Sequence, residues 1–90
     1  MQTYQQYRLR RNGLTWSDLG DEVVILDLQS STYFSARGTS TVLVHELVAG
    51  ASIDTLVARI VAEYEISEDT AQKDVDAFIR QLDNCELLEH

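Results

Sequence analysis

Residues 22–37 read EVVILDLQSSTYFSAR, two extended apolar segments joined by the polar connection Gln29-Ser30-Ser31. The first segment, EVVILDL, has the period of two that is typical of a β-strand. We expect one set of its alternate side chains to face the core, namely Val24, Leu26 and Leu28. Val23 and Ile25 would then lie on the opposite face, which is unusually apolar for a surface in contact with water.

The second segment, TYFSA, also alternates, and this pattern predicts a further strand. The piece LTWSD at residues 14–18 precedes the turn signal Leu19-Gly20-Asp21 and predicts an earlier strand. Together the three segments predict an antiparallel meander whose last strand lies at an edge. In this last strand Phe34 and Ala36 would share one face and Tyr33 and Ser35 the other, with Phe34 expected in the core.

From residue 39 onward the apolar period lengthens to about three and a half residues, which predicts helices. The first helix is expected over residues 41–49, ending at Gly50. Ser52 and Ser67 begin two more helices as N-caps, each followed by acids that the helix dipole favours. The third helix is expected to bury Ala71, Val75, Phe78, Leu82 and Cys85, and Leu87 and Leu88 close the core. The predicted fold is α+β and winged-helix-like, with a three-stranded antiparallel sheet followed by three helices.

A chain of 90 residues, 44% of them hydrophobic, has room for one domain with one modest core. We assign residues 14–88 to this domain, residues 1–13 to an N-terminal arm or extra strand, and residues 89–90 to a tail of the kind that an expression vector adds. The net charge of −8 repels phosphates, so neither nucleic acid nor a membrane is an expected partner. No apolar run approaches the roughly 20 residues that span a bilayer, and we expect a cytoplasmic protein.

The sequence shows no catalytic or metal-binding constellation. No serine or cysteine is placed by the sequence to act as a nucleophile beside His45. Cys85 is the only cysteine, so neither an internal disulfide nor a thiolate cluster for zinc can form. The four glycines are isolated and build no phosphate-binding loop. We therefore expect no enzymatic activity, no metal and no cofactor.

A winged-helix DNA-binding regulator would have similar secondary structure and is an alternative from a different class. Its third helix would have to approach DNA phosphates. The acids of this helix region outnumber its basic residues: Glu68, Asp69, Asp74, Asp76, Asp83 and Glu86 against Lys73 and Arg80. This charge has the wrong sign for binding to a nucleic acid.

Three stretches in this order resemble a known family: GDEVVILDLQSSTYFSARGTSTVLVHEL, then SIDTLVARIVAEY, then ISEDTAQKDVDAFIRQLDNCELL. Over residues 14–88 the chain resembles the PqqD-like domains called RiPP recognition elements. It is most similar to the free-standing leader-binding proteins of lasso-peptide pathways. It departs from the family pattern after the aromatic strand, where Ala36-Arg37 stands in place of Leu-Asn and Gly38 comes early.

The resemblance implies a non-catalytic recognition protein that binds the leader of a ribosomally made precursor as an added strand on the sheet edge, against the third helix. It implies three partners: the precursor leader peptide, a cysteine-type leader peptidase and an ATP-dependent lasso cyclase, to which the leader would be delivered. It leaves open a second reading, a PqqD-like chaperone for another peptide class, such as the substrate of a radical enzyme.

An edge strand offers unpaired amides and carbonyls as a template for an extended peptide. On the third helix, Val75 and Ile79 could floor a groove for leader side chains, and the neighbouring acids could pair with leader Lys or Arg. Arg37 is expected to meet an acidic leader residue, unless it is a solvated charge that protects the edge from aggregation. Phe34 has an alternative role in the core. The predicted peptide-binding residues are Thr32, Tyr33, Phe34, Ser35, Ala36, Arg37, Val75, Asp76, Ile79 and Asp83.

Overall fold

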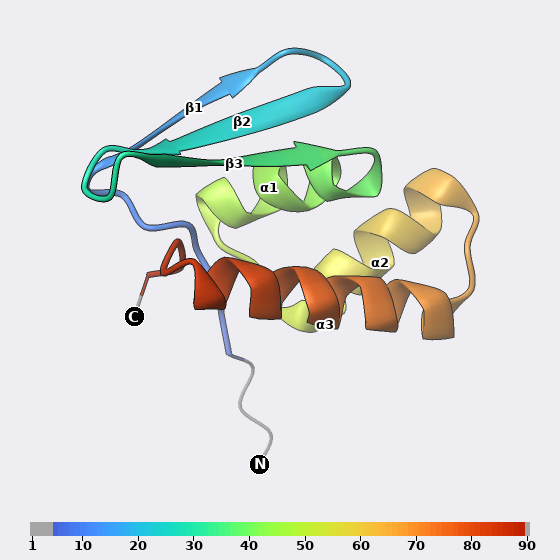
Figure 1. Cartoon of the computed structure of the whole chain (residues 1–90). Helices are drawn as coiled ribbons and strands as arrows, with labels where there is room; N and C mark the ends of the chain where they lie inside the picture. Colours follow the sequence, from blue (N-terminus) through green and yellow to red (C-terminus); the bar gives the residue numbers. More distant parts are fainter. Residues whose placement is uncertain (1–4, 90) are drawn as a thin grey trace.

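Three strands and then three helices follow one another along the chain, and the helices lie on one face of the sheet (Figure 1). The computed structural model describes residues 5–89, so residues 1–4 of the predicted arm and residue 90 of the predicted tail lie outside it. The elements are β1 (Leu14–Asp18), β2 (Glu22–Asp27), β3 (Thr32–Arg37), α1 (Thr39–Ala49), α2 (Ile53–Tyr64) and α3 (Glu68–Asn84). The strands pair antiparallel in the order β1-β2-β3, which confirms the predicted fold class.

The phase of β2 differs from the prediction by one residue. Val23 and Ile25 face the helices and are 0% and 1% exposed, whereas Leu26 is 40% and Leu28 57% exposed. The expectation that Val24, Leu26 and Leu28 face the core was therefore wrong. Strand geometry fixes the alternation but not its phase, and a segment that is apolar at both phases gives no preference by hydrophobicity alone.

β3 has the predicted phase. Ala36 is buried, and the ring of Phe34 packs edge-on against Phe78 of α3, with 6.0 Å between the ring centroids. Tyr33 and Ser35 are exposed on the other face. This alternation was readable because the two phases of β3 differ clearly in polarity.

The N-caps of α2 and α3 are the predicted serines. Ser52 and Ser67 each accept a hydrogen bond at 3.2 Å from a backbone N–H, that of Thr55 and that of Thr70. α1 begins at Thr39, earlier than predicted. The helices bury a continuous set of side chains: Leu43, Val44, Leu47, Leu56, Val57, Ile60, Ala71, Val75, Phe78, Ile79 and Leu82.

Cys85 is exposed, so the prediction that it is buried was wrong. It is the C-cap of α3, one residue beyond the last helical turn. Glu86 follows at a φ of 59°, and this change of direction returns the chain to the core. Leu87 and Leu88 are each 3% exposed, as predicted.

The N-terminal segment of residues 5–13 runs beside the helices before it enters β1 (Figure 1). Tyr7 and Ala51 exchange two backbone hydrogen bonds, at 2.8 and 2.9 Å. Leu9 forms an isolated bridge with Leu88 and is 6% exposed. The segment is therefore attached by isolated β-bridges and does not add a strand to the sheet.

One ion pair joins this segment to the sheet. The Nη2 atom of Arg10 lies 2.8 Å from Oδ1 of Asp27, and its Nη1 donates to the carbonyl oxygen of Glu86 at 3.0 Å. Burial raises the pKa of Asp27, but hydrogen bonds from Gln29 and Ser30 and the charge of Arg10 outweigh it and hold the pKa below its usual value. The ionised carboxylate of Asp27 therefore stabilises the folded state.

Acid should remove this contribution of Asp27. A depressed carboxyl pKa gives stability above the unfolded-state pKa, and this is lost as the pH falls through the lower folded-state value. We expect Asp27→Asn to lower the urea midpoint at neutral pH and to reduce the loss of stability below about pH 4. Urea titrations of both proteins over this pH range measure the effect. Parallel pH curves would contradict the role of Asp27.

Candidate functional site

β3 is an edge strand. It pairs with β2 along one side, and within residues 5–89 no strand pairs with its other side. Its outward-facing main-chain groups are thus free to bond an extended polypeptide, which would become a fourth strand. Six residues, Thr32–Arg37, form this edge.

A cavity of about 330 Å³ lies beside this edge, where β3 approaches the end of α3. We call it the edge cavity. Its lining includes the apolar side chains of Ile25, Phe34 and Leu87, with more polar groups around them. The remaining lining residues are Asp27, Ser30, Thr32, Tyr33 and Cys85. A peptide strand added to β3 would pass this cavity and could place one side chain in it.

One flank of α3 faces β3. Phe78 contacts Phe34, and Cys85, about two turns further along, lines the edge cavity. Ile79 follows Phe78 directly, and neighbouring residues on a helix point about 100° apart. Ile79 therefore lies on a different flank of α3, in the lining of another cavity.

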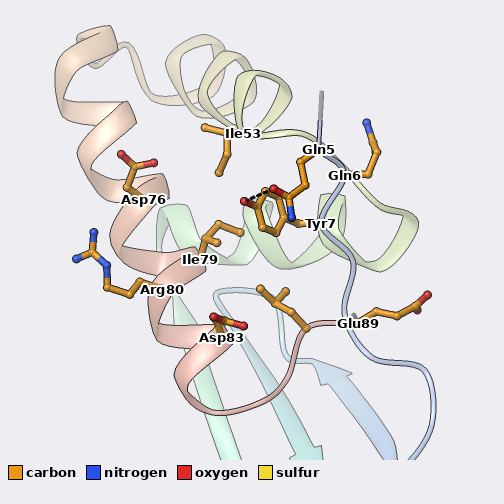
Figure 2. A pocket seen from close by; sticks show the side chains of 10 residues that line it. Gln5, Gln6, Tyr7, Ile53, Asp76, Ile79, Arg80, Asp83 and Glu89 are labelled. Carbon is orange, nitrogen blue, oxygen red and sulfur yellow. Dashed lines mark hydrogen bonds between the residues drawn. The ribbon is translucent and has the colours of Figure 1, made fainter. Parts of the chain in front are cut away.

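The flank of α3 that carries Ile79 lines a second cavity of about 390 Å³, which we call the arm cavity. Figure 2 shows Asp76, Ile79 and Asp83 of α3 around it, with Ile79 pointing toward Tyr7 of the N-terminal segment. Its other lining residues are Gln5, Gln6, Ile53, Arg80, Leu88 and Glu89. Of the predicted floor and rim residues, Ile79, Asp76 and Asp83 line this cavity, and its lining includes no residue of β3.

The structure thus divides the predicted peptide-binding residues. Thr32, Tyr33 and Phe34 line the edge cavity, and Ser35, Ala36 and Arg37 continue β3 beyond it. Asp76, Ile79 and Asp83 line the arm cavity, and Val75 is 0% exposed in the core, where it cannot floor a groove. Ile79 and the residues of β3 therefore line two different cavities. The sequence reasoning missed Cys85 and Leu87 at the edge cavity. The spacing of seven residues, about two helical turns, places Cys85 on the same flank as Phe78 and could have indicated its position.

Arg37 lies at the far end of β3 on the face away from the helices. Its side chain is 77% exposed, and its Nε lies 3.3 Å from Oε2 of Glu22. The hydroxyl of Ser35 donates to the same carboxylate. Ser35 and Arg37 together lower the pKa of Glu22 below its usual value, so the carboxylate is charged at neutral pH. An acidic ligand residue would have to compete with Glu22 for Arg37.

The family of Coenzyme PQQ synthesis protein D (PqqD) matches residues 22–88, which include β2, β3 and all three helices. The chain belongs to the PqqD family. This confirms the resemblance seen in the sequence. A search of curated proteins finds no match.

Two solved structures resemble this PqqD-family chain. The structure described as TbiB1 in complex with the TbiA(beta) leader peptide is 33% identical with a TM-score of 0.83, over 91% of this chain and 94% of that one. The structure described as lasso peptide synthetase B1 complexed with the leader peptide is 24% identical with a TM-score of 0.80, over 93% and 98%. Both share the fold, and the first is also related in sequence.

Within the described part of this PqqD-family chain, no three His, Cys, Asp or Glu side chains are grouped so that they could hold a metal ion. His45 is half-exposed, with its Nε2 2.9 Å from Oδ2 of Asp18 and its ring beside Trp16. This arrangement pairs a surface histidine with an acid and an aromatic ring. Among the same residues, no helix is long and apolar enough to cross a membrane.

Proposed function

We propose that this chain binds the leader peptide of a ribosomally made precursor as a fourth strand beside β3, with one leader side chain in the edge cavity. The observation that carries the proposal is the open β3 edge next to a partly apolar cavity of about 330 Å³. It is supported by membership of the PqqD family and by the 33% identity to a protein solved with a leader peptide. The peptide contacts would then be Cys85, at the C-cap of α3, and Thr32–Arg37 on the strand.

The two parts of this site contribute differently to binding. Each main-chain hydrogen bond contributes about 1 kcal/mol net and carries little information about the peptide sequence. Full burial of a Val, Leu or Ile side chain contributes about 1.5–3 kcal/mol. The edge cavity should therefore decide which leader is bound, while the exposed charge of Arg37, at the far end of β3, affects mainly the association rate.

We further propose that the chain performs no chemistry itself and delivers the leader to a cysteine-type leader peptidase and to an ATP-dependent lasso cyclase in the cytoplasm. Support for these partners comes from the sequence resemblance to the free-standing proteins of lasso-peptide pathways. A chaperone for another peptide class, such as a radical-enzyme substrate, is the second candidate. The matching family is described as a coenzyme PQQ synthesis protein, and this description supports the chaperone as a second candidate.

Amide chemical shifts test the binding site directly. The unlabelled leader of the neighbouring lasso precursor is titrated into ¹⁵N-labelled protein, and a radical-enzyme precursor is tested in parallel. We expect the amides of Thr32–Arg37 to shift on addition of the correct leader. Those of the other sheet edge, Leu14–Asp18, serve as the internal control and should stay in place. The absence of β3 shifts with every leader would refute the proposal, and shifts with only the radical-enzyme precursor would favour the second candidate.

A further inference from the structure

Two contacts fix the direction in which α3 runs relative to β3. The ring of Phe34 meets that of Phe78, and Cys85 lines the edge cavity together with Thr32, at the start of the strand. α3 therefore runs opposite to β3, as Figure 1 also shows. A step from Phe34 toward the end of β3 then corresponds to a step from Phe78 toward the start of α3.

Asp74 is the acid that this direction brings level with the end of β3. It stands four residues before Phe78, and residues four apart share one side of a helix. Four helical residues rise about 6 Å, and two strand residues rise about 6–7 Å. Asp74 therefore lies level with Ala36, on the flank of α3 that faces β3.

The fold gives the charge of Asp74 no partner. Its side chain is exposed, and within residues 5–89 no hydrogen bond or ion pair joins it to another side chain. Partners on the same helix come from positions three and four residues away, which are here Thr70, Ala71, Ala77 and Phe78. None of these is basic. Asp74 also lies beyond the first turn of α3, so the helix dipole does not account for an acid at this position.

A leader strand beside β3 would bring one of its inward side chains to Asp74. Side chains on the same face of a strand are two residues apart. From Cys85 at the edge cavity to Asp74, α3 rises about 16 Å over eleven residues. Four strand residues cover about 13 Å and six cover about 20 Å, so a spacing of four fits this distance best. The leader side chain that meets Asp74 is then four positions from the one in the edge cavity.

We infer that Asp74 selects leaders that carry a lysine or arginine four positions from the apolar side chain in the edge cavity. This inference rests on the proposed function and names the chemistry of the ligand at a second point of the same edge. A long cationic side chain can reach the exposed carboxylate and pair with it. An acidic side chain at the same leader position would face a like charge, which discriminates against that leader.

The test begins with the leader that shifts the β3 amides. Each alanine variant of this leader is combined with Cys85→Asp, and the apolar anchor is the residue whose replacement makes the Kd insensitive to Cys85→Asp. A lysine or arginine should stand four positions from it. We expect Asp74→Asn to weaken binding of the wild-type leader about two- to fivefold and Asp74→Lys at least about tenfold, measured by fluorescence anisotropy.

Asp76 provides the matched control. It is an exposed acid two residues further along α3, but it lines the arm cavity. Asp76→Asn and Asp76→Lys change the net charge by the same amounts as the two Asp74 variants. At physiological ionic strength, where distant charges are screened, they should change the Kd less than about twofold. Circular dichroism confirms that all four variants are folded.

An exchange of the two charges separates a direct pair from a general effect of charge. A leader with glutamate in place of the lysine or arginine should bind the wild-type protein at least about tenfold more weakly, and Asp74→Lys should recover most of this loss. Wild-type affinity in folded Asp74 variants, equal recovery by Asp76→Lys, or a leader without a basic residue four positions from its anchor would each overturn the inference. Failure of the wild-type protein to bind any leader would instead refute the proposed function itself.

Discussion

Leader affinity should fall about 10- to 100-fold when Cys85 is replaced by aspartate. An apolar leader side chain in the edge cavity contributes about 1.5–3 kcal/mol, and about 1.4 kcal/mol corresponds to a factor of ten in Kd. A carboxylate at residue 85 would have to lose its water to admit that side chain, which is unfavourable without a partner. Cys85 is exposed at the C-cap of α3, so the substitution should leave the fold intact. Fluorescence anisotropy of a labelled leader measures the effect.

Two further variants separate the edge cavity from the arm cavity. Cys85→Ser keeps the size of the side chain and should bind nearly as the wild type does. Arg80→Gln makes the net charge more negative by the same amount as Cys85→Asp, but at the arm cavity, and should change the Kd less than about twofold. Weaker binding by Arg80→Gln together with unchanged binding by Cys85→Asp would place the leader against Asp76 and Ile79, as the sequence first suggested.

The order and type of the elements could be predicted from the sequence because each has a strong local signal. The serines at positions 52 and 67 mark two helix starts, and acids follow each of them. The change of period near residue 39 separates strands from helices. The open edge also follows from sequence, since a three-stranded meander leaves its last strand unpaired on one side. These features follow from residues close together in the sequence, so they could be predicted without knowledge of any tertiary contact.

The helix side of the site could not be predicted in the same way. The apolar stripe of α3 is wide, with Phe78 on one flank and Ile79 on the other, and both are buried. The sequence shows the width of this stripe but not which flank faces the sheet and which faces the N-terminal segment. That choice depends on how α3 packs against α2 and the sheet, which local periodicity does not encode.

The phase of β2 was wrong for a related reason. Asp27 shares the buried phase of Val23 and Ile25, and an acid at a core position counts against that phase. It is tolerated because Arg10, seventeen positions away, forms an ion pair with it. The hydrophobic pattern of β2 alone therefore cannot show which of its faces is buried, because Asp27 is tolerated in the core only through Arg10.

Substitution of the adjacent β2 residues Ile25 and Leu26 by alanine should show directly which phase is buried. The loss of stability in Ile25→Ala is the largest that we expect. Ile25 is 1% exposed and Leu26 40% exposed, and their side chains contain the same atoms. Ile25→Ala removes buried methyl groups and leaves a cavity, which costs about 2–5 kcal/mol. Leu26→Ala removes only cross-strand contact on the outer face, which costs below about 1 kcal/mol. Urea unfolding followed by circular dichroism measures both values.

The comparison of Ile25→Ala with Leu26→Ala also decides which face of β2 is buried. A free energy of unfolding that falls more for Leu26→Ala would restore the phase predicted from the sequence. A large loss for Ile25→Ala with little change for Leu26→Ala would mean that the fold gains little from Leu26. Leu26 would then contribute mainly through its cross-strand contact with Tyr33.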